Sequence, residues 1–149
     1  MWRTAETPRF NSEYTVSVDG RKFDVRVPVT EAEKNRGYRE VAAIPENECM
    51  LFMYAYPRPM TFTMQNCLVG LRIVFCDKDY RVLQVSDAAA GVPEVPCNNP
   101  LCQNVIEFGL ERNPPNVKAG ERVVVVITPK SKQDFYNMPA FFRSVFDLN

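Results

Sequence analysis

The fold is decided by residues 71–86, which read LRIVFC-DKDY-RVLQVS. Two runs rich in β-branched and apolar residues, 71–76 and 81–86, flank a polar tetrapeptide. Aspartate favours turns because its side chain accepts hydrogen bonds from nearby backbone amides. We therefore predict a β-hairpin here. We interpret Asp77 and Asp79 as turn residues, since a calcium loop needs several more oxygen ligands in sequence.

Outward from this hairpin, the chain continues as short runs of period two separated by turn residues, a pattern typical of strands. Residues 13–18 and 22–27 alternate around an Asp-Gly-Arg turn at 19–21. Asp-Gly is the strongest short hairpin signal, so these runs predict a second hairpin. The sequence Thr-Glu-Ala-Glu at 30–33 has the form of a capping box. It predicts one short helix that ends near Gly37.

The remaining strands follow from apolar content and from the positions of proline. Large apolar or aromatic side chains predict strands at 50–54, 61–64 and 105–108. The valine-rich run 123–128 predicts a last strand that is buried on both faces. Residues 88–104 hold three prolines, each without a backbone donor, and we expect them to form a surface loop.

These elements predict a mainly β protein: a compact antiparallel β-sandwich or barrel-like domain with one short helix, followed by an aromatic C-terminal tail. We expect an N-terminal arm at 1–12, a single β-domain at 13–128 and a docking tail at 129–149, since 149 residues fit one domain. The predicted core gathers apolar side chains from the strands, namely Leu51, Phe52, Phe62, Ile73, Phe75, Val105, Val124 and Val126.

Composition argues against several classes of function. The chain has no histidine, so it lacks the usual base of a catalytic triad and the commonest metal ligand. Its 18 Lys and Arg balance 18 Asp and Glu, and both halves are close to neutral, which argues against nucleic acid as a partner. No window has the pattern of a signal peptide or a transmembrane segment. We therefore expect a protein of the cytoplasm or of a virion, without nucleic-acid or membrane partners.

Six short blocks, in order along the chain, are similar to one known family. They are EKNRGY at 33–38, CMLFMY at 49–54, FTMQNC at 62–67, LRIVFCD at 71–77, NVIE at 104–107 and VKAGERV at 117–123. The family patterns are a helix that ends in Arg-Gly-Leu, then Gly-Met-Leu-Phe-Val-Phe, Phe-Trp-Met-Lys-Asn-Thr, Leu-Asp-Ile-Ile-Phe-Ile-Asp, Tyr-Val-Leu-Glu and Ile-Lys-Xaa-Gly-Asp-Xaa-Val. Over residues 13–127 the chain thus resembles the family called domain of unknown function 192 (DUF192). The resemblance implies a compact, mainly antiparallel β-fold with one short helix and no established enzymatic activity.

The chain departs from that family pattern at three polar positions. Thr63, Gln65 and Arg72 stand where the pattern has tryptophan, lysine and aspartate. The apolar positions of the same blocks are kept. The comparison with the pattern therefore implies that the fold is retained while a polar family site is lost.

The five cysteines are open to more than one interpretation. Cys67 and Cys76 lie among apolar residues and are expected to be small, buried and inert side chains. Cys97 and Cys102 lie in the expected loop 88–104, where we predict the accessible thiols. A disulfide could form between these two or to another chain. A zinc site would need a second close pair of ligands, so no metal is predicted.

No catalytic residue and no cofactor are predicted either. A cysteine nucleophile needs a base within hydrogen-bond reach, and a chain without histidine lacks the usual one. Glu107, within Val-Ile-Glu-Phe, could face a pocket, but glycoside hydrolysis requires two carboxylates. Glycine-rich phosphate loops are missing, because the six glycines are scattered. We therefore expect that the protein is not an enzyme.

The leading hypothesis is a non-enzymatic structural or interaction protein, a subunit of a larger assembly. A capsid-decorating or neck subunit of a virion is the specific expectation, with protein subunits, either copies of itself or other components, as partners. The expected interface is the tail, whose aromatic side chains would expose a large apolar patch if nothing covered them: Phe135, Tyr136, Phe141, Phe142 and Phe146. The alternative is a small-ligand or carbohydrate-binding module with its site between residues 62–66 and the loop 88–104.

Overall fold

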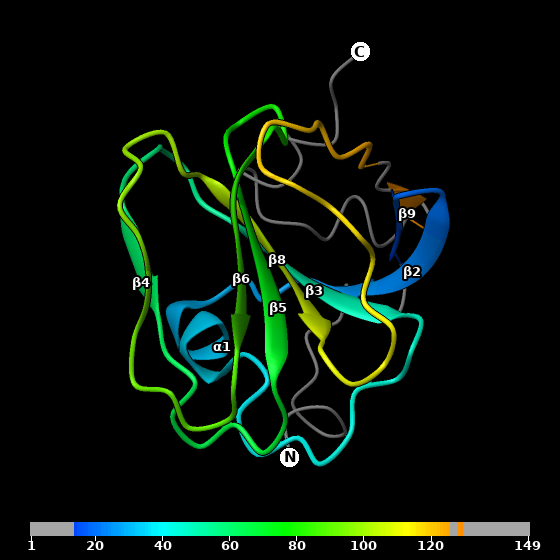
Figure 1. Cartoon of the computed structure of the whole chain (residues 1–149), viewed down its shortest axis with the longest axis vertical. Helices are drawn as coiled ribbons and strands as arrows, with labels where there is room; N and C mark the ends of the chain where they lie inside the picture. Colours follow the sequence, from blue (N-terminus) through cyan, green and yellow to red (C-terminus); the bar gives the residue numbers. More distant parts are fainter. Residues whose placement is uncertain (1–13, 126–127, 130–149) are drawn as a thin grey trace.

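The computed structural model describes residues 14–125 together with 128 and 129, and it shows a mainly β domain with one short helix (Figure 1). The described elements are, in chain order, β1 (Tyr14–Val18), β2 (Arg21–Arg26), α1 (Glu31–Arg36), β3 (Glu48–Met53), β4 (Met60–Phe62), β5 (Leu71–Cys76), β6 (Val82–Ala88), β7 (Val95–Cys97), β8 (Asn104–Gly109) and β9 (Thr128–Pro129). The predicted fold class is confirmed. The arm and the aromatic tail lie outside the described residues, so the predicted domain boundaries stay predictions.

Most strands belong to one sheet. Its order is β6-β5-β8-β3-β2-β1-β9, while β4 and β7 pair separately. All named pairs are antiparallel except β2 and β3, which run parallel because the connection through α1 crosses over between them. In Figure 1, α1 and β4 lie to the left of the central strands, and β2 and β9 lie to the right.

The predicted hairpin around Asp19 is confirmed as β1 and β2. Val18 pairs with Arg21, so Asp19 and Gly20 alone form the loop. Their φ angles are 52° and 73°. A type I′ turn needs positive φ at both central positions, and Asp-Gly is one of the dipeptides that tolerate it.

The predicted hairpin at residues 71–86 is confirmed as β5 and β6. Asp77 Oδ1 accepts hydrogen bonds from the amides of Asp79 at 2.8 Å and Arg81 at 2.9 Å. Tyr80, the last residue of the turn, has a φ of 63°. The turn therefore accounts for the carboxylate of Asp77.

The predicted capping box is present at the start of α1. Thr30 Oγ1 accepts a hydrogen bond from the amide of Glu33 at 3.1 Å. Glu33 Oε1 accepts in return from the amides of Thr30 at 3.0 Å and Val29 at 2.9 Å. At the other end Gly37 caps the helix with a φ of 48°, which glycine adopts most easily. These contacts fix both ends of a helix that is too short to be stable alone.

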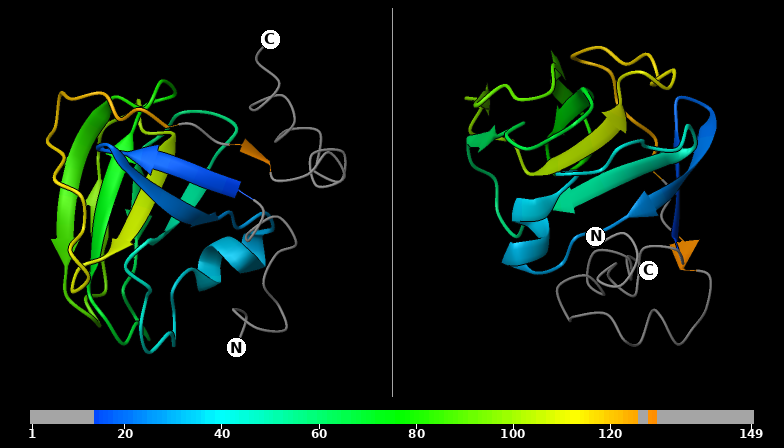
Figure 2. Two further views of the ribbon diagram at one scale, coloured as in Figure 1. Left: turned by 90° about the vertical axis from the view of Figure 1, so that its right-hand side faces the viewer. Right: turned by 90° about the horizontal axis from the view of Figure 1, so that it is seen from below.

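The large sheet is curved, and side chains cover both of its faces. On one face, residues of the β1–β2 hairpin pack in one cluster with residues of β5, β6 and β8. The left view in Figure 2 shows this hairpin crossing in front of the other strands. On the opposite face, residues of β3, β5 and β8 pack with β4, β7 and the segment after α1. We call the first the hairpin face and the second the helix face.

The expectation that residues 88–104 form only a surface loop is wrong. Strand β7 lies within this range and pairs with β4, and both Val95 and Cys97 are buried. Pro96 is tolerated at its centre because β7 has a partner strand on one side only. Its carbonyl accepts a hydrogen bond from Gln84 Nε2 at 2.8 Å.

The predicted strand 123–128, buried on both faces, is also wrong. Val123 is buried, but Val124 is 67% exposed. The backbone here lies beside the start of β6, with the amide of Val123 donating to the carbonyl of Tyr80 at 2.9 Å. Among the described residues of this segment, the strand is Thr128–Pro129, which pairs with β1. Because the segment lies at the margin of the hairpin-face cluster rather than in the centre of the sheet, one side stays open.

The predicted core is largely confirmed, but it is two cores rather than one. Phe62 is partly buried, Val124 is exposed, and Val126 lies outside the described residues. Leu51 packs on the hairpin face, whereas the other buried members pack on the helix face. The buried residues of the predicted set are Leu51, Phe52, Ile73, Phe75 and Val105.

No helix in the described part of the chain is long and apolar enough to cross a bilayer.

The placement of Phe75 generates a stability prediction. Its side chain is fully buried, and its ring meets the Phe62 ring edge-on at 5.7 Å between centroids. Phe75→Ala should lower the free energy of unfolding by about 3–5 kcal/mol, because it leaves a cavity in the helix-face core. Urea denaturation measures this. Leu68→Ala, at a position that is 60% exposed, is the control and should change the value by less than about 0.5 kcal/mol. Equal effects of the two substitutions would contradict the described core.

Candidate functional site

The candidate site is built around one buried acid on β8. Glu107 lies opposite Met50 of β3 and Ile73 of β5 in the sheet register. Residues paired in this way share a face, and Met50 and Ile73 belong to the helix-face cluster. The Glu107 side chain is 4% exposed. No hydrogen bond or ion pair joins its carboxyl group to any described residue.

Glu107 lines a cavity of about 240 Å³ between the sheet and α1. We call it the helix-side cavity, and its chemistry comes from three stretches of chain in addition to β8. They are α1 with the turn after it, the β3–β4 connection and the turn after β4. Its ionisable lining side chains include Lys34, Tyr38, Arg39, Arg58, Cys67 and Glu107.

Gly37 brings the end of α1 close to the sheet. A Cβ atom added there would lie 3.6 Å from the Phe52 ring and 4.0 Å from Glu107 Oε1, which are ordinary contact distances. The positive φ, rather than lack of space, therefore favours glycine at this position. The turn therefore places Lys34 and Arg36, at the end of α1, at the same cavity as Glu107.

Tyr38 is held by a buried polar network. Its hydroxyl donates a hydrogen bond to Glu48 Oε2 at 3.0 Å, and Glu48 Oε1 lies 3.2 Å from Arg26 Nε. Burial and the Glu48 carboxylate raise the pKa of Tyr38 well above its ordinary value. The network joins β2 and β3 to the segment after α1, and so fixes one wall of the cavity.

Burial raises the pKa of Glu107 to about 8. The ionised form would lose its hydration in these surroundings, and no opposite charge lies close enough to compensate within the described structure. The carboxyl group is therefore protonated at neutral pH. In that form it offers one O–H donor together with acceptor oxygens.

Cations line the same cavity without being neutralised by described acids. Lys34 Nζ and the guanidinium carbon of Arg58 each lie 4.5 Å from the centroid of the Tyr54 ring. Arg39 has a buried Nε with no hydrogen-bond partner among the described residues. In this part of the chain, neither these arginines nor Lys34 form an ion pair. Within the described structure, the cavity is therefore lined by three cations without an ion-pair partner and by an acid without one.

One wall of the cavity is aromatic. The rings of Phe52 and Phe62 meet edge-on with centroids 5.1 Å apart, and Phe62 meets Phe75 in the same way. Such pairs are worth about 0.5–1.5 kcal/mol beyond their buried area. The part of the lining formed by Phe52 and Phe62 is therefore apolar and well packed.

The three departures from the family pattern do not lie together. Thr63 lines the cavity, whereas Gln65 is exposed and outside it. Arg72 alternates with Leu71 and Ile73 along β5, so it points away from the helix face. The expectation that all three mark one lost polar site therefore has no support in the geometry.

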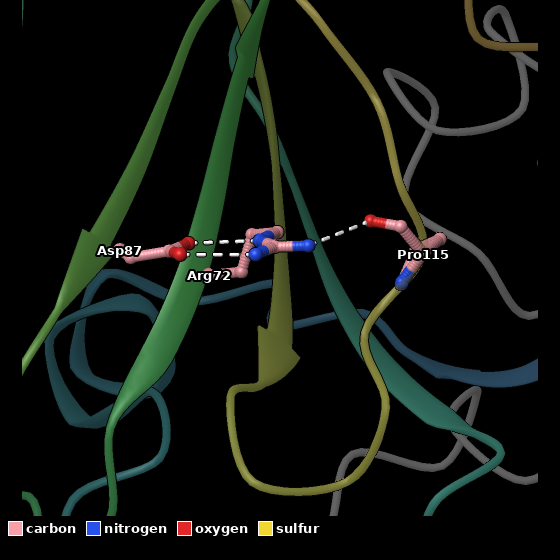
Figure 3. A network of polar contacts seen from close by, with 3 residues as sticks. All are labelled: Arg72, Asp87 and Pro115. Atoms are coloured by element: carbon pink, nitrogen blue, oxygen red, sulfur yellow. Dashed lines mark hydrogen bonds and ion pairs between the residues drawn. The ribbon is translucent and has the colours of Figure 1, made fainter.

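Arg72 instead forms a structural tie (Figure 3). Its Nε and Nη2 donate to the two carboxylate oxygens of Asp87 at 2.8 and 2.9 Å, and its Nη1 donates to the carbonyl of Pro115 at 3.1 Å. The hydrogen bonds from Arg72 lower the pKa of Asp87. The pair joins β5 and β6 to the segment after β8.

The expectation of accessible thiols in the 88–104 range is wrong. Cys97 and Cys102 are fully buried, because β7 packs on the helix face and the turn before Cys102 folds it inward. Both are free thiols in this structure, and the disulfide between them or to another chain stays a prediction. Burial and then Cys97 raise the pKa of Cys102 to about 12. Cys67 and Cys76 are buried, as predicted.

The other predicted sites have different outcomes. The expected ligand site between 62–66 and 88–104 is not where the cavity lies, since no residue of 88–104 lines it. The aromatic interface residues of the tail fall outside the described residues, so that interface stays a prediction. Within the described part of the chain, no three Cys, Asp or Glu side chains gather in a way that could hold a metal ion.

Sequence reasoning noticed Glu107 but missed the cations. A signal for Glu107 was present, because one acid interrupts a strand that is otherwise apolar. Arg39 and Arg58 lie in irregular segments with no period, so nothing local separates them from ordinary surface arginines. Only the fold brings them to the same cavity.

The chain belongs to the DUF192 family, whose model, described as an uncharacterised ACR, matches residues 14–125. A solved structure of a protein of unknown function from Novosphingobium aromaticivorans is similar, with 26% sequence identity, a TM-score of 0.57, and coverage of 65% of this chain and 71% of that one. Another, from Sinorhizobium meliloti and described as a candidate transcription regulator, has 17% identity, a TM-score of 0.64, and coverage of 76% and 92%. That second likeness shows the fold alone. No curated protein matches the sequence.

The raised pKa of Glu107 predicts a pH-dependent stability. A glutamate has a pKa of about 4.5 before folding and about 8 here, so the folded state holds an extra proton between these values. The free energy of unfolding should therefore fall as pH rises through this window, by about 1.4 kcal/mol per pH unit from this group. In urea denaturation from pH 5 to 9, Glu107→Gln should remove that contribution. Glu111→Gln, at an exposed position, is the control and should leave the pH dependence of the free energy of unfolding unchanged.

Parallel pH profiles for the wild type and Glu107→Gln would contradict the burial of an unpaired acid.

The buried cysteines predict slow thiol chemistry. Thiolates are the reactive form, and burial raises the pKa of Cys67 to about 11 and holds those of Cys49 and Cys76 above their ordinary range. Iodoacetamide at pH 8 should label the native protein far more slowly than the protein in urea, which serves as the positive control. Cys67 should react first, because it lines the cavity. Mass mapping that found Cys97 or Cys102 labelled first would contradict the structure.

Proposed function

We propose that this member of the DUF192 family binds a small polar ligand in the helix-side cavity. The observation that carries the proposal is the carboxyl group of Glu107, which is buried, lines the cavity and has no hydrogen-bond partner among the described residues. The carboxyl oxygens open onto the cavity instead of being sealed in the core. A polar group inside a protein needs a hydrogen-bond partner, from the protein, water or a ligand. A polar group of a ligand would supply the missing partner.

Stability alone does not account for an acid at this position. The neighbours of Glu107 in the sheet, Met50 and Ile73, are apolar and fully buried. A leucine there would match them and remove the unpaired group. Strongly perturbed acids that face a cleft mark functional sites more often than structural ones. Ligand binding is therefore the better explanation of the glutamate.

The cavity limits the kind of ligand. Its volume of about 240 Å³ lies below the range of drug-sized sites, about 300–1,000 Å³, so the ligand is small. The Phe52 and Phe62 rings offer an apolar wall, and Thr63 and the cations offer polar contacts. A molecule of monosaccharide size or smaller, with one apolar face and several oxygen atoms, suits these walls.

The role as a subunit of a larger assembly, including a virion component, is a separate proposal. It depends on the aromatic tail, whose aromatic residues lie outside the described residues. Ligand binding at the cavity and docking through the tail involve different parts of the chain, so each can hold without the other. The absence of enzymatic activity stays a prediction as well.

The test is a binding screen that depends on Glu107. A library of small polar metabolites is added to ¹⁵N-labelled protein at pH 6.5, where Glu107 is protonated. Binders should shift the amide signals of cavity residues such as Gly37, Thr63 and Cys67. Glu107→Leu should abolish these shifts while the fold, followed by circular dichroism, is kept. The same variant should be more stable than the wild type at pH 8, because the unpaired group is gone.

Glu111→Leu makes the same change at an exposed position and should leave binding intact. Binders that shift only other regions, or that bind Glu107→Leu equally well, would refute the proposal. So would a screen in which nothing shifts the cavity signals.

A further inference from the structure

We infer that the ligand of the helix-side cavity is a small organic anion. Its carboxylate or phosphate group is bound by cationic side chains that line the cavity, and Glu107 donates a hydrogen bond to it. This inference rests on the proposed function and names the chemical class of its ligand.

The charge of the side chains that line the cavity favours an anionic ligand. Four cations line the cavity, namely Lys34, Arg36, Arg39 and Arg58. The acids are Glu31 and Glu107, and Glu107 is neutral at pH 7 because burial raises its pKa. Arg36 is engaged in a further interaction, so three positive charges, those of Lys34, Arg39 and Arg58, face the negative charge of Glu31, in a chain whose total formal charge is zero. This local excess attracts anions.

Arg39, Cys67 and Glu107 line the same cavity. Arg39 has a buried Nε without a partner among the described residues. Burial is the main cause of the raised pKa of Cys67, but Glu107 raises it further and Arg39 lowers it. Both groups therefore act on the Cys67 thiol across the cavity that all three side chains line. A ligand that occupies this cavity meets the acid, the thiol and the guanidinium group on its walls.

The lining groups Arg39 and Glu107 call for a ligand group that accepts hydrogen bonds. A guanidinium group only donates, and a protonated carboxyl group can donate as well. One group that accepts from both is an oxyanion, and charge-assisted hydrogen bonds to arginine are among the strong ones in proteins. An ammonium ligand would be repelled by Arg39. A neutral hydroxyl can also accept two hydrogen bonds, but it lacks the charge that strengthens those from arginine.

Lys34 and Arg58 are held in place without losing their charge. Both lie over the Tyr54 ring, and Arg58 Nη1 also donates to the carbonyl of Tyr56 at 3.3 Å. Contact with an aromatic face orients a cation but does not neutralise it. The remaining N–H donors of Lys34 and Arg58 are available to a ligand in the cavity.

The experiment compares probes that share one ring and differ in charge. Glucose, glucuronate, glucose 6-phosphate and glucosamine are titrated at pH 6.5, with amide shifts at the cavity as the readout. An anionic probe should bind at least about tenfold more tightly than glucose, and glucosamine should bind more weakly than glucose. Tighter binding of glucuronate would identify the carboxylate source. Tighter binding of glucose 6-phosphate would identify the phosphate source.

Arg39→Gln is the matched variant. It should weaken binding of the preferred anionic probe about tenfold or more, because it removes a charged donor. Arg112→Gln makes the same change at an exposed position outside the lining and should alter the affinity less than twofold. Equal effects of both variants would show only a general charge effect and would overturn the inference.

The pH dependence tests Glu107. The charged and titratable groups around the cavity are Glu31, Lys34, Arg36, Tyr38 and Arg39 from the helix side. Tyr54, Arg58 and Cys67 complete the set from the other side, and burial raises the pKa of Tyr54 to about 12 and of Cys67 to about 11. Burial lowers the pKa of Lys34, so loss of its charge at high pH weakens anion binding in every variant.

Glucuronate affinity should therefore fall about tenfold more between pH 6.5 and 9 in the wild type than in Glu107→Gln, because about a tenth of Glu107 stays protonated one unit above a pKa of about 8. Equal pH profiles would overturn the role of Glu107.

The outcomes separate the inference from the proposed function. If glucose or another neutral compound shifts the cavity signals as strongly as the anions do, the inference fails and the binding site remains. If no anionic probe binds in the cavity while a neutral library compound does, the inference also fails and the proposed function remains. If nothing shifts the cavity signals, both the inference and the proposed function fail.

Discussion

The structure depends on the burial of β8 on both of its faces. All six of its residues are buried, and its backbone is paired with β3 on one edge and β5 on the other. A strand in this position needs a cover on each side. The curved β1–β2 hairpin supplies one, and the segment after α1 with the β4–β7 pair supplies the other. Any polar side chain on β8 must then find its partner inside the protein or in a ligand, and Glu107 has none in the described structure.

The parts of the fold that the sequence predicted are those decided by contacts within a few residues. The Asp19-Gly20 loop, the Asp77 turn and the Thr30 capping box each depend on hydrogen bonds or backbone angles inside one short segment. The segments that were predicted wrongly depend on distant partners. Val95 of β7 pairs with Phe62, and Val123 is bonded to Tyr80. Proline and valine content could not reveal those partners, because a proline is tolerated on an outer strand and a valine can be exposed.

The site was less predictable than the fold for the same reason. Glu107 was visible in the sequence as one acid within an apolar strand, but its burial and its raised pKa come from neighbours on other strands. The cations come from α1 and from the β3–β4 connection, and only the packing of these segments on the helix face brings them to the acid. The same effect reversed the expectation for Cys97 and Cys102, because a segment rich in turn residues is folded inward.

The three departures from the family pattern differ in whether they bear on the helix-side cavity. Arg72 points to the other face and is engaged with Asp87, and Gln65 is exposed, so neither bears on the helix-side cavity. Thr63 alone lines it. Threonine is smaller than the tryptophan of the pattern, so this change leaves space beside the Phe52 and Phe62 wall instead of removing a cation or the acid. A change that enlarges a cavity, while Arg39, Arg58 and Glu107 still line it, is expected to alter which ligand fits rather than to abolish binding.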